Sequence, residues 1–63
     1  MISTSYDPDA DAMFVWFGPE GIKAVGTEEV APGVILDFDA NGDVIGIEVL
    51  HVRRRMAQPK AAA

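Results

Sequence analysis

The sequence predicts a mainly β domain, with a small α+β fold as the variant: an antiparallel β-meander of hairpins in a single twisted sheet, followed by a short irregular or helical C-terminal tail. Three observations predict it. Residues 2–6 alternate in polarity, residues 12–17 are apolar throughout, and two apolar segments flank the turn-forming residues 39–43. Before residue 52 there is no amphipathic segment long enough for a stable helix, so strand pairing must supply most of the fold.

Length and composition limit how this sheet is stabilised. A chain of 63 residues forms one domain at most, and at this size folding buries only about 60% of the surface that the unfolded chain exposes. Hydrophobic residues make up 49% of the chain, and the absence of cysteine excludes disulfides and thiolate metal sites. We expect one β domain over residues 1–52, held by packing alone, and a basic, flexible tail over residues 53–63 that is frayed at residues 58–63.

A hairpin is predicted at the N-terminus. In residues 2–6, apolar or β-branched side chains alternate with serines, which is typical of a half-buried strand. Residues 7–11 (Asp-Pro-Asp-Ala-Asp) predict the loop, because proline presets a turn and aspartate side chains bond to nearby backbone. Residues 12–17 are too short for a helix and predict a strand buried on both faces.

The middle of the chain is less regular. Residues 18–21 (Gly-Pro-Glu-Gly) predict a loop that follows the first hairpin. Residues 22–30 then predict a strand with a weaker pattern, which ends at residues 31–33 (Ala-Pro-Gly). Gly26 interrupts it and indicates a bulge or an edge position.

The second half predicts a hairpin between residues 34–38 and 44–52. A tight turn at Asn41 and Gly42 would make one face continuously apolar by pairing Phe38 with Ile45, Leu36 with Ile47 and Val34 with Val49. A slip of one residue would scatter that face and is disfavoured, whereas a slip of two residues preserves it and stays open.

The other face of this hairpin is mixed and needs a cover. It carries Asp37, Asp39 and Glu48 together with Ile35, Val44, Leu50 and Val52. Either a second chain packs sheet against sheet, or residues 50–57 fold back over the sheet; three consecutive arginines suit a core poorly, so we favour a homodimer. The candidates for partner or dimer contacts are Phe14, Trp16, Ile35, Leu50, Arg53, Arg54 and Arg55.

Charge is divided unevenly along the chain. Residues 1–52 hold all ten acidic residues and only Lys23, a net charge of −9, whereas residues 53–63 carry +4. The acidic body would repel a nucleic-acid backbone, so we expect the arginines to pair within the chain or across a dimer. The longest apolar run, residues 12–17, is far too short to span a bilayer and no signal peptide is evident, so a cytoplasmic protein without a membrane segment is expected.

Four pieces, in this order and spacing, resemble the YuzE-like family of small bacterial proteins, known as domain of unknown function 2283. They are Ser5-Tyr6-Asp7-Pro8-Asp9-Ala10-Asp11-Ala12, Thr27-Glu28-Glu29-Val30, Gly33-Val34-Ile35-Leu36-Asp37-Phe38-Asp39 and Gly46-Ile47-Glu48-Val49-Leu50. The resemblance covers roughly residues 2–52. It implies a small, mostly β domain, and it implies no established activity, cofactor or catalytic residue.

Residues 37–48 match the calcium-loop pattern, with oxygen-bearing side chains at Asp37, Asp39 and Asn41, glycine at position 6 and Glu48 at position 12. That pattern also needs a helix on each side, and here strand-forming residues lie on both flanks. We therefore expect a hairpin turn, and we keep these four residues as a weaker alternative for a metal site.

No catalytic constellation is recognised. Asp7, Asp9 and Asp11 are expected to be a solvated turn, because acid–base pairs need environments that separate their pKa values. His51 has no serine or cysteine placed to partner it, and it is expected to pack or cap. No phosphate loop or metalloprotease motif occurs, so we expect neither an enzyme nor a cofactor.

Together these observations predict an uncharacterised, homo-oligomeric protein-binding or regulatory module without catalytic activity, with an unidentified protein partner. Two alternatives stay open: an antitoxin-like partner of a toxin protein, and an acidic-loop binder of calcium.

Overall fold

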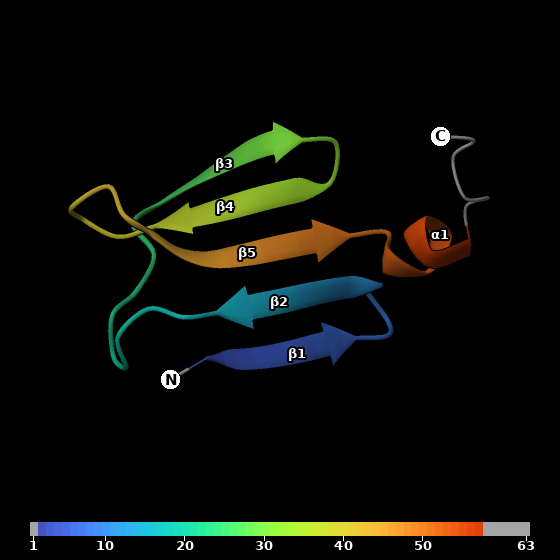
Figure 1. The fold of residues 1–63 in the computed structure, drawn as a ribbon, viewed down its shortest axis with the longest axis horizontal. Helices are drawn as coiled ribbons and strands as arrows, with labels where there is room; N and C mark the ends of the chain where they lie inside the picture. Colours follow the sequence, from blue (N-terminus) through green and yellow to red (C-terminus); the bar gives the residue numbers. More distant parts are fainter. Residues whose placement is uncertain (1, 58–63) are drawn as a thin grey trace.

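The computed structural model describes residues 2–57 and forms one open sheet followed by a short helix (Figure 1). The elements are β1 (Ser3–Asp7), β2 (Ala12–Trp16), β3 (Gly26–Ala31), β4 (Val34–Phe38), β5 (Val44–Leu50) and α1 (Val52–Ala57). The predicted antiparallel sheet of hairpins with a helical tail is confirmed. The frayed end predicted at residues 58–63 lies outside the described residues.

The order of the strands is β1-β2-β5-β4-β3, and all pairs are antiparallel. β5 therefore joins the N-terminal hairpin to the β3–β4 hairpin, while residues 17–25 cross the end of the sheet to reach its far edge (Figure 1). The strand predicted over residues 22–30 begins only at Gly26, because the crossing occupies the residues before it. β3 is an edge strand, as Gly26 indicated, but its register shift lies between Glu29 and Ala31.

The register of β4 against β5 is confirmed in two of the three predicted pairs, Val34 with Val49 and Leu36 with Ile47. The third was wrong: Phe38 pairs with Val44, and Ile45 is the extra residue of a bulge. The turn is wider than a two-residue turn, since the backbone N–H of Asp39 donates to the Asp43 carbonyl at 2.9 Å.

The bulge at Ile45 ties this hairpin to the end of β2. The Ile45 carbonyl accepts hydrogen bonds from the backbone N–H groups of Phe17 and Gly18, both at 3.0 Å. A Cβ on Gly18 would lie 2.7 Å from the Cβ of Ile45, so only glycine allows this approach. The Ile45 side chain is 3% exposed, and the bulge thus contributes one of the few buried side chains.

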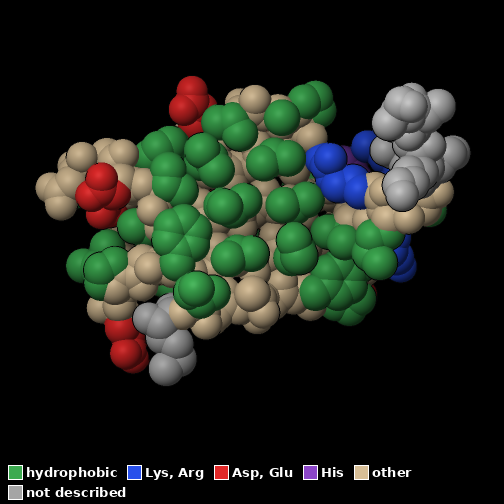
Figure 2. Space-filling view, viewed as in Figure 1, with side chains coloured by type: hydrophobic (Ala, Val, Ile, Leu, Met, Phe, Trp, Pro, Cys, Tyr) green, Lys and Arg blue, Asp and Glu red, His purple; other side chains and the backbone are tan. Residues whose placement is uncertain are grey.

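The pairing divides the strand residues between two faces, because residues directly opposite each other point to the same side. The "apolar face" comprises Thr4, Tyr6, Met13, Val15, Glu28, Ala31, Val34, Leu36, Phe38, Val44, Ile47 and Val49. The bulge moves Val44 onto this face from the face predicted for it. Hydrophobic side chains cover the sheet in Figure 2, which fits this face. The "acidic face" comprises Ser3, Ser5, Asp7, Phe14, Trp16, Thr27, Glu29, Ile35, Asp37, Glu48 and Leu50.

Neither face is covered within the described chain. Among residues 2–57, Ala12 and Ile45 are the only hydrophobic residues that are buried, and no large side chain is fully enclosed. α1 stands beyond the end of β5 rather than over the sheet (Figure 1), so the alternative in which residues 50–57 fold back as a cover is wrong. No helix among residues 2–57 has the length and apolar character needed to cross a membrane.

Candidate functional site

The loop between β1 and β2 is organised by its aspartates. The Asp7 carboxylate accepts hydrogen bonds from the backbone N–H groups of Asp9, at 3.0 Å, and Ala10, at 3.3 Å. Asp11 closes the loop with a φ of 54°, a left-handed conformation that aspartate tolerates better than most residues. The predicted turn chemistry is confirmed for Asp7, whereas Asp11 has a further role.

Asp11 connects this loop to the beginning of α1. Its carboxylate accepts hydrogen bonds from the Tyr6 hydroxyl at 2.7 Å, the Arg53 backbone N–H at 3.1 Å and Arg53 Nε at 3.2 Å. Its backbone carbonyl accepts from the Val52 N–H at 3.2 Å. Asp11 thus caps a helix that lies 42 residues away in the chain, and the side chain predicted to be solvated is only 20% exposed.

A second set of contacts fixes α1 from the β3–β4 turn. Arg55 Nε donates to the Leu50 carbonyl at 2.8 Å, and its guanidinium also donates to the Pro32 carbonyl at the turn. Arg53 and Arg55 therefore both bond within the chain, Arg53 to a carboxylate and Arg55 to backbone carbonyls. The helix holds the end of the sheet together rather than covering it.

These hydrogen bonds shift the pKa values of Asp11 and Tyr6 in opposite directions. The Tyr6 hydroxyl bond, followed by the backbone bond and charge of Arg53, lowers the pKa of Asp11, although desolvation opposes the shift. The same hydroxyl bond raises the pKa of Tyr6, because the neutral phenol is the donor. The hydrogen bond therefore favours the ionised carboxylate of Asp11 and the neutral phenol of Tyr6, which are the forms present near neutral pH.

We expect the stability of the protein to fall at both ends of the pH range because of this pair. Stabilisation by the Asp11 carboxylate is present above its unfolded pKa, near 4, and is lost as the pH falls through its lower folded pKa. Stabilisation by the Tyr6 hydroxyl is present below its unfolded pKa of about 10 and is lost as the pH rises through its higher folded pKa. Thermal melts from pH 2 to 11 measure both limbs. In Asp11→Asn the melting temperature should fall less at low pH than it does in the native protein. An unchanged pH profile in that variant would contradict the role assigned to Asp11.

The residues of the calcium-like pattern do not converge. Asp39 Oδ1 accepts hydrogen bonds from the backbone N–H groups of Asn41, at 2.9 Å, and Asp43, at 3.0 Å, so this oxygen builds the turn. Asp37 lies in β4 and Glu48 in β5, on the acidic face and away from that turn. Across residues 2–57, no group of three or more histidine, aspartate or glutamate side chains is placed to hold a metal ion.

The acidic face contains a row of residues that crosses the sheet through Trp16, Gly46 and Asp37. From the point where a Cβ of Gly46 would lie, Trp16 Cε3 is 3.0 Å away and Asp37 Oδ2 is 3.1 Å away. The missing side chain of Gly46 thus leaves the space in which the indole ring and the carboxylate come together. Of the predicted contact residues, Phe14, Trp16, Ile35 and Leu50 all lie on this face, while Arg53, Arg54 and Arg55 lie in α1 at the end of the sheet.

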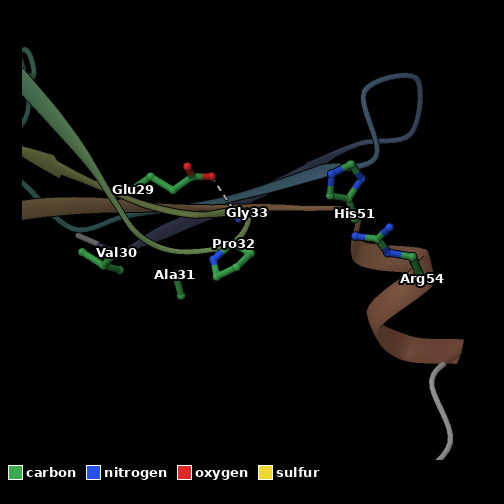
Figure 3. A pocket seen from close by; sticks show the side chains of 7 residues that line it. All are labelled: Glu29, Val30, Ala31, Pro32, Gly33, His51 and Arg54. Atoms are coloured by element: carbon green, nitrogen blue, oxygen red, sulfur yellow. Dashed lines mark hydrogen bonds between the residues drawn. The ribbon is translucent and has the colours of Figure 1, made fainter.

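An open pocket of about 460 Å³ lies beside the β3–β4 turn, lined by Glu29, Val30, Ala31, Pro32, Gly33, His51 and Arg54 (Figure 3). Glu29 accepts a hydrogen bond from the Gly33 N–H at 3.1 Å. His51 has a φ of 58°, and its backbone carbonyl accepts a hydrogen bond from the Arg55 N–H at 3.0 Å, so it stands directly before the first turn of α1. The lining contains no serine, threonine, cysteine or lysine that His51 could activate.

Comparison with known proteins supplies a family for this arrangement. A relative from Methanocaldococcus jannaschii, "Uncharacterized protein MJ0789", is 36% identical over 53 residues, which are 84% of this chain and 43% of the relative. The chain thus spans less than half the length of that relative. No solved structure matches the chain. The family model of the protein of unknown function DUF2283 matches residues 4–53, from β1 to the first turn of α1. The chain belongs to the DUF2283 family.

Proposed function

We propose that this chain is a non-catalytic protein-binding or regulatory domain that forms a homodimer through its apolar face and presents its acidic face to a protein partner. The observation that carries the proposal is a mismatch between composition and burial. Hydrophobic residues make up 49% of the sequence, yet among residues 2–57 only Ala12 and Ile45 of these are buried. A sheet with a continuous apolar face is stabilised when a second layer covers that face.

A second copy is the cover that the charges favour. The strands contain no lysine or arginine, and Glu28, on the outermost strand, is the only acidic residue among them on the apolar side. Packing apolar face against apolar face removes Leu36 and Ile47 from water and keeps the acidic faces of the two copies apart. Two sheets of the same twist also pack readily in an aligned sandwich, and a two-fold interface is complementary to itself.

The antitoxin-like alternative is a special case of this proposal, in which the partner at the acidic face is a toxin protein. A toxin-like reading frame beside the gene would favour it. The calcium alternative has less support, because Asp37, Asp39 and Glu48 lie apart and Asp39 Oδ1 is already used by the turn.

Sedimentation equilibrium over a wide range of concentrations tests the dimer. We expect a mass of two chains at micromolar concentrations and above, and a melting temperature that rises with protein concentration, because dissociation and unfolding are then linked. A single-chain mass throughout, with a melting temperature independent of concentration, would refute the proposed dimer.

A further inference from the structure

We propose that the acidic face binds an extended basic segment of a partner protein, and that an arginine or lysine of that segment enters beside Trp16 to pair with Asp37. This inference rests on the proposed function, since it names the chemistry of the partner at the outward face. One side chain of the acidic face is not explained by the fold itself.

That side chain is Asp37, which is 6% exposed in the middle of β4. Within residues 2–57 its carboxylate makes no ion pair and accepts no hydrogen bond, whereas Asp7, Asp11 and Asp39 all accept backbone N–H groups. A buried carboxylate is normally paired, because losing water without a partner is costly. No side-chain polar atom in this part of the chain is both sealed from solvent and unbonded, so the oxygens of Asp37 keep an opening to solvent.

Trp16 lies next to Asp37, over the same glycine. Its Cε3 and Cζ3 atoms lie 3.0 and 3.3 Å from the point where a Cβ of Gly46 would lie, and Asp37 Oδ2 lies 3.1 Å from the same point. An aromatic ring beside a carboxylate attracts a cation through two interactions: a cation–π contact with the face of the ring and an ion pair with the carboxylate. An arginine guanidinium, which is planar and a multiple donor, fits such a site especially well.

The charges around the site select a basic partner from outside the described chain. Asp7, Glu29 and Glu48 share the acidic face with Asp37, and the strands supply no basic residue to balance them. Arg53 bonds to Asp11 and Arg55 bonds to the Leu50 carbonyl, so both are occupied at the end of the sheet.

The spacing of two carboxylates indicates an extended segment. Glu48 pairs with Ile35, two residues before Asp37 on β4, so Glu48 and Asp37 are diagonal neighbours on one face. Such neighbours lie roughly 7–8 Å apart. In an extended peptide, side chains at alternate positions point to the same side and lie about 7 Å apart. Arginines separated by one residue therefore match the two carboxylates.

A peptide titration tests this inference, with two probes of identical composition: Gly-Arg-Ser-Arg-Gly and Gly-Arg-Arg-Ser-Gly. Trp16 is the only tryptophan, so its fluorescence reports binding at the proposed site, and calorimetry gives the affinity. We expect saturable binding of the first peptide, at least tenfold tighter than that of the second. Equal affinities, or no saturable binding of either peptide, would overturn the proposal.

Two variants distinguish binding at Asp37 from a non-specific attraction between the basic peptide and the acidic protein. Asp37→Asn should weaken binding of the first peptide at least tenfold and raise the melting temperature of the free protein, because an unpaired buried charge is removed. Glu28→Gln removes the same charge on the other side of the sheet and should change the affinity less than twofold. Equal losses in both variants, or an Asp37→Asn variant that binds normally or melts at a lower temperature, would refute the role of Asp37.

Two further outcomes are distinguished in the same samples. If the peptide binds only after Arg54→Ala, then Arg54 of a second copy fills the site and the proposal is wrong. Sedimentation of each sample tests the dimer separately: a dimer that fails to bind the peptide refutes this inference alone, whereas a monomer that binds it refutes the proposed dimer alone.

Discussion

Replacing Leu36 with lysine is expected to convert the protein to monomers and to lower its stability. Leu36 pairs with Ile47 near the middle of the apolar face, and two-fold symmetry would place the new charge twice in the dimer. An unpaired buried charge costs about 3–5 kcal/mol, so the dimer dissociation constant should rise at least about 100-fold. Sedimentation equilibrium of Leu36→Lys against the native sequence measures the change.

The neighbouring residue Ile35 provides the matched control. It lies on the same strand, is also half-buried and points to the acidic face. Ile35→Lys should therefore remain a dimer, even where its stability differs. Equal dissociation in the two variants would show that the dimer does not use the apolar face. Should Leu36→Lys fail to fold, the concentration dependence of the melting temperature of the native protein still tests the interface.

The second large effect is expected at Asp11. Asp11→Ala removes the acceptor for Tyr6 and Arg53 and places alanine at a φ of 54°. We expect the melting temperature to fall on the order of 10 °C, because a lost cap and left-handed strain each destabilise a small domain by several degrees. The Arg53 amide should also lose its protection against hydrogen exchange, which reports the detachment of α1 directly.

Two companion variants separate the causes. Asp11→Gly keeps the backbone freedom and loses the carboxylate, so a smaller fall than in Asp11→Ala measures the strain. Asp9→Ala alters a side chain in the same loop that makes no hydrogen bond within residues 2–57, and it should change the melting temperature by less than roughly 3 °C. If Asp9→Ala and Asp11→Ala are equally destabilising, the assigned role of Asp11 is incorrect.

Much of the sheet could be predicted from local sequence, because strand periodicity and turn chemistry act over a few residues. Residues 34–38 were predicted with their observed limits, and two pairs of the second hairpin were predicted in register. The bulge at Ile45 could not be predicted, since the carbonyl it presents is used by Phe17 and Gly18 from a distant part of the chain. Likewise, nothing local to residues 17–25 indicates that β5 would lie between β2 and β4.

The functional residues divide in the same way. The turn role of Asp7 follows from its neighbours, but the role of Asp11 depends on Arg53, 42 residues away, and no spacing rule links them. The contact candidates Ile35 and Leu50 were predicted on one face from the hairpin register, and the pairing of β2 with β5 brings Phe14 and Trp16 to the same face. Asp37 was predicted to lie on the mixed face of the second hairpin and within a metal pattern, but its burial without a partner could not be predicted, because that is a property of the folded chain.

The position of β5 in the sheet also sets an order of assembly. The hairpins β3–β4 and β4–β5 join strands that are neighbours in sequence, so they close short loops and can form early. The β1–β2 hairpin finds its place only when β2 pairs with β5, so during synthesis it must wait until β5 has been made. The bonds from Asp11 to Arg53 need both the first hairpin and α1 in place, so docking of that hairpin and ordering of α1 should be a single late step in folding.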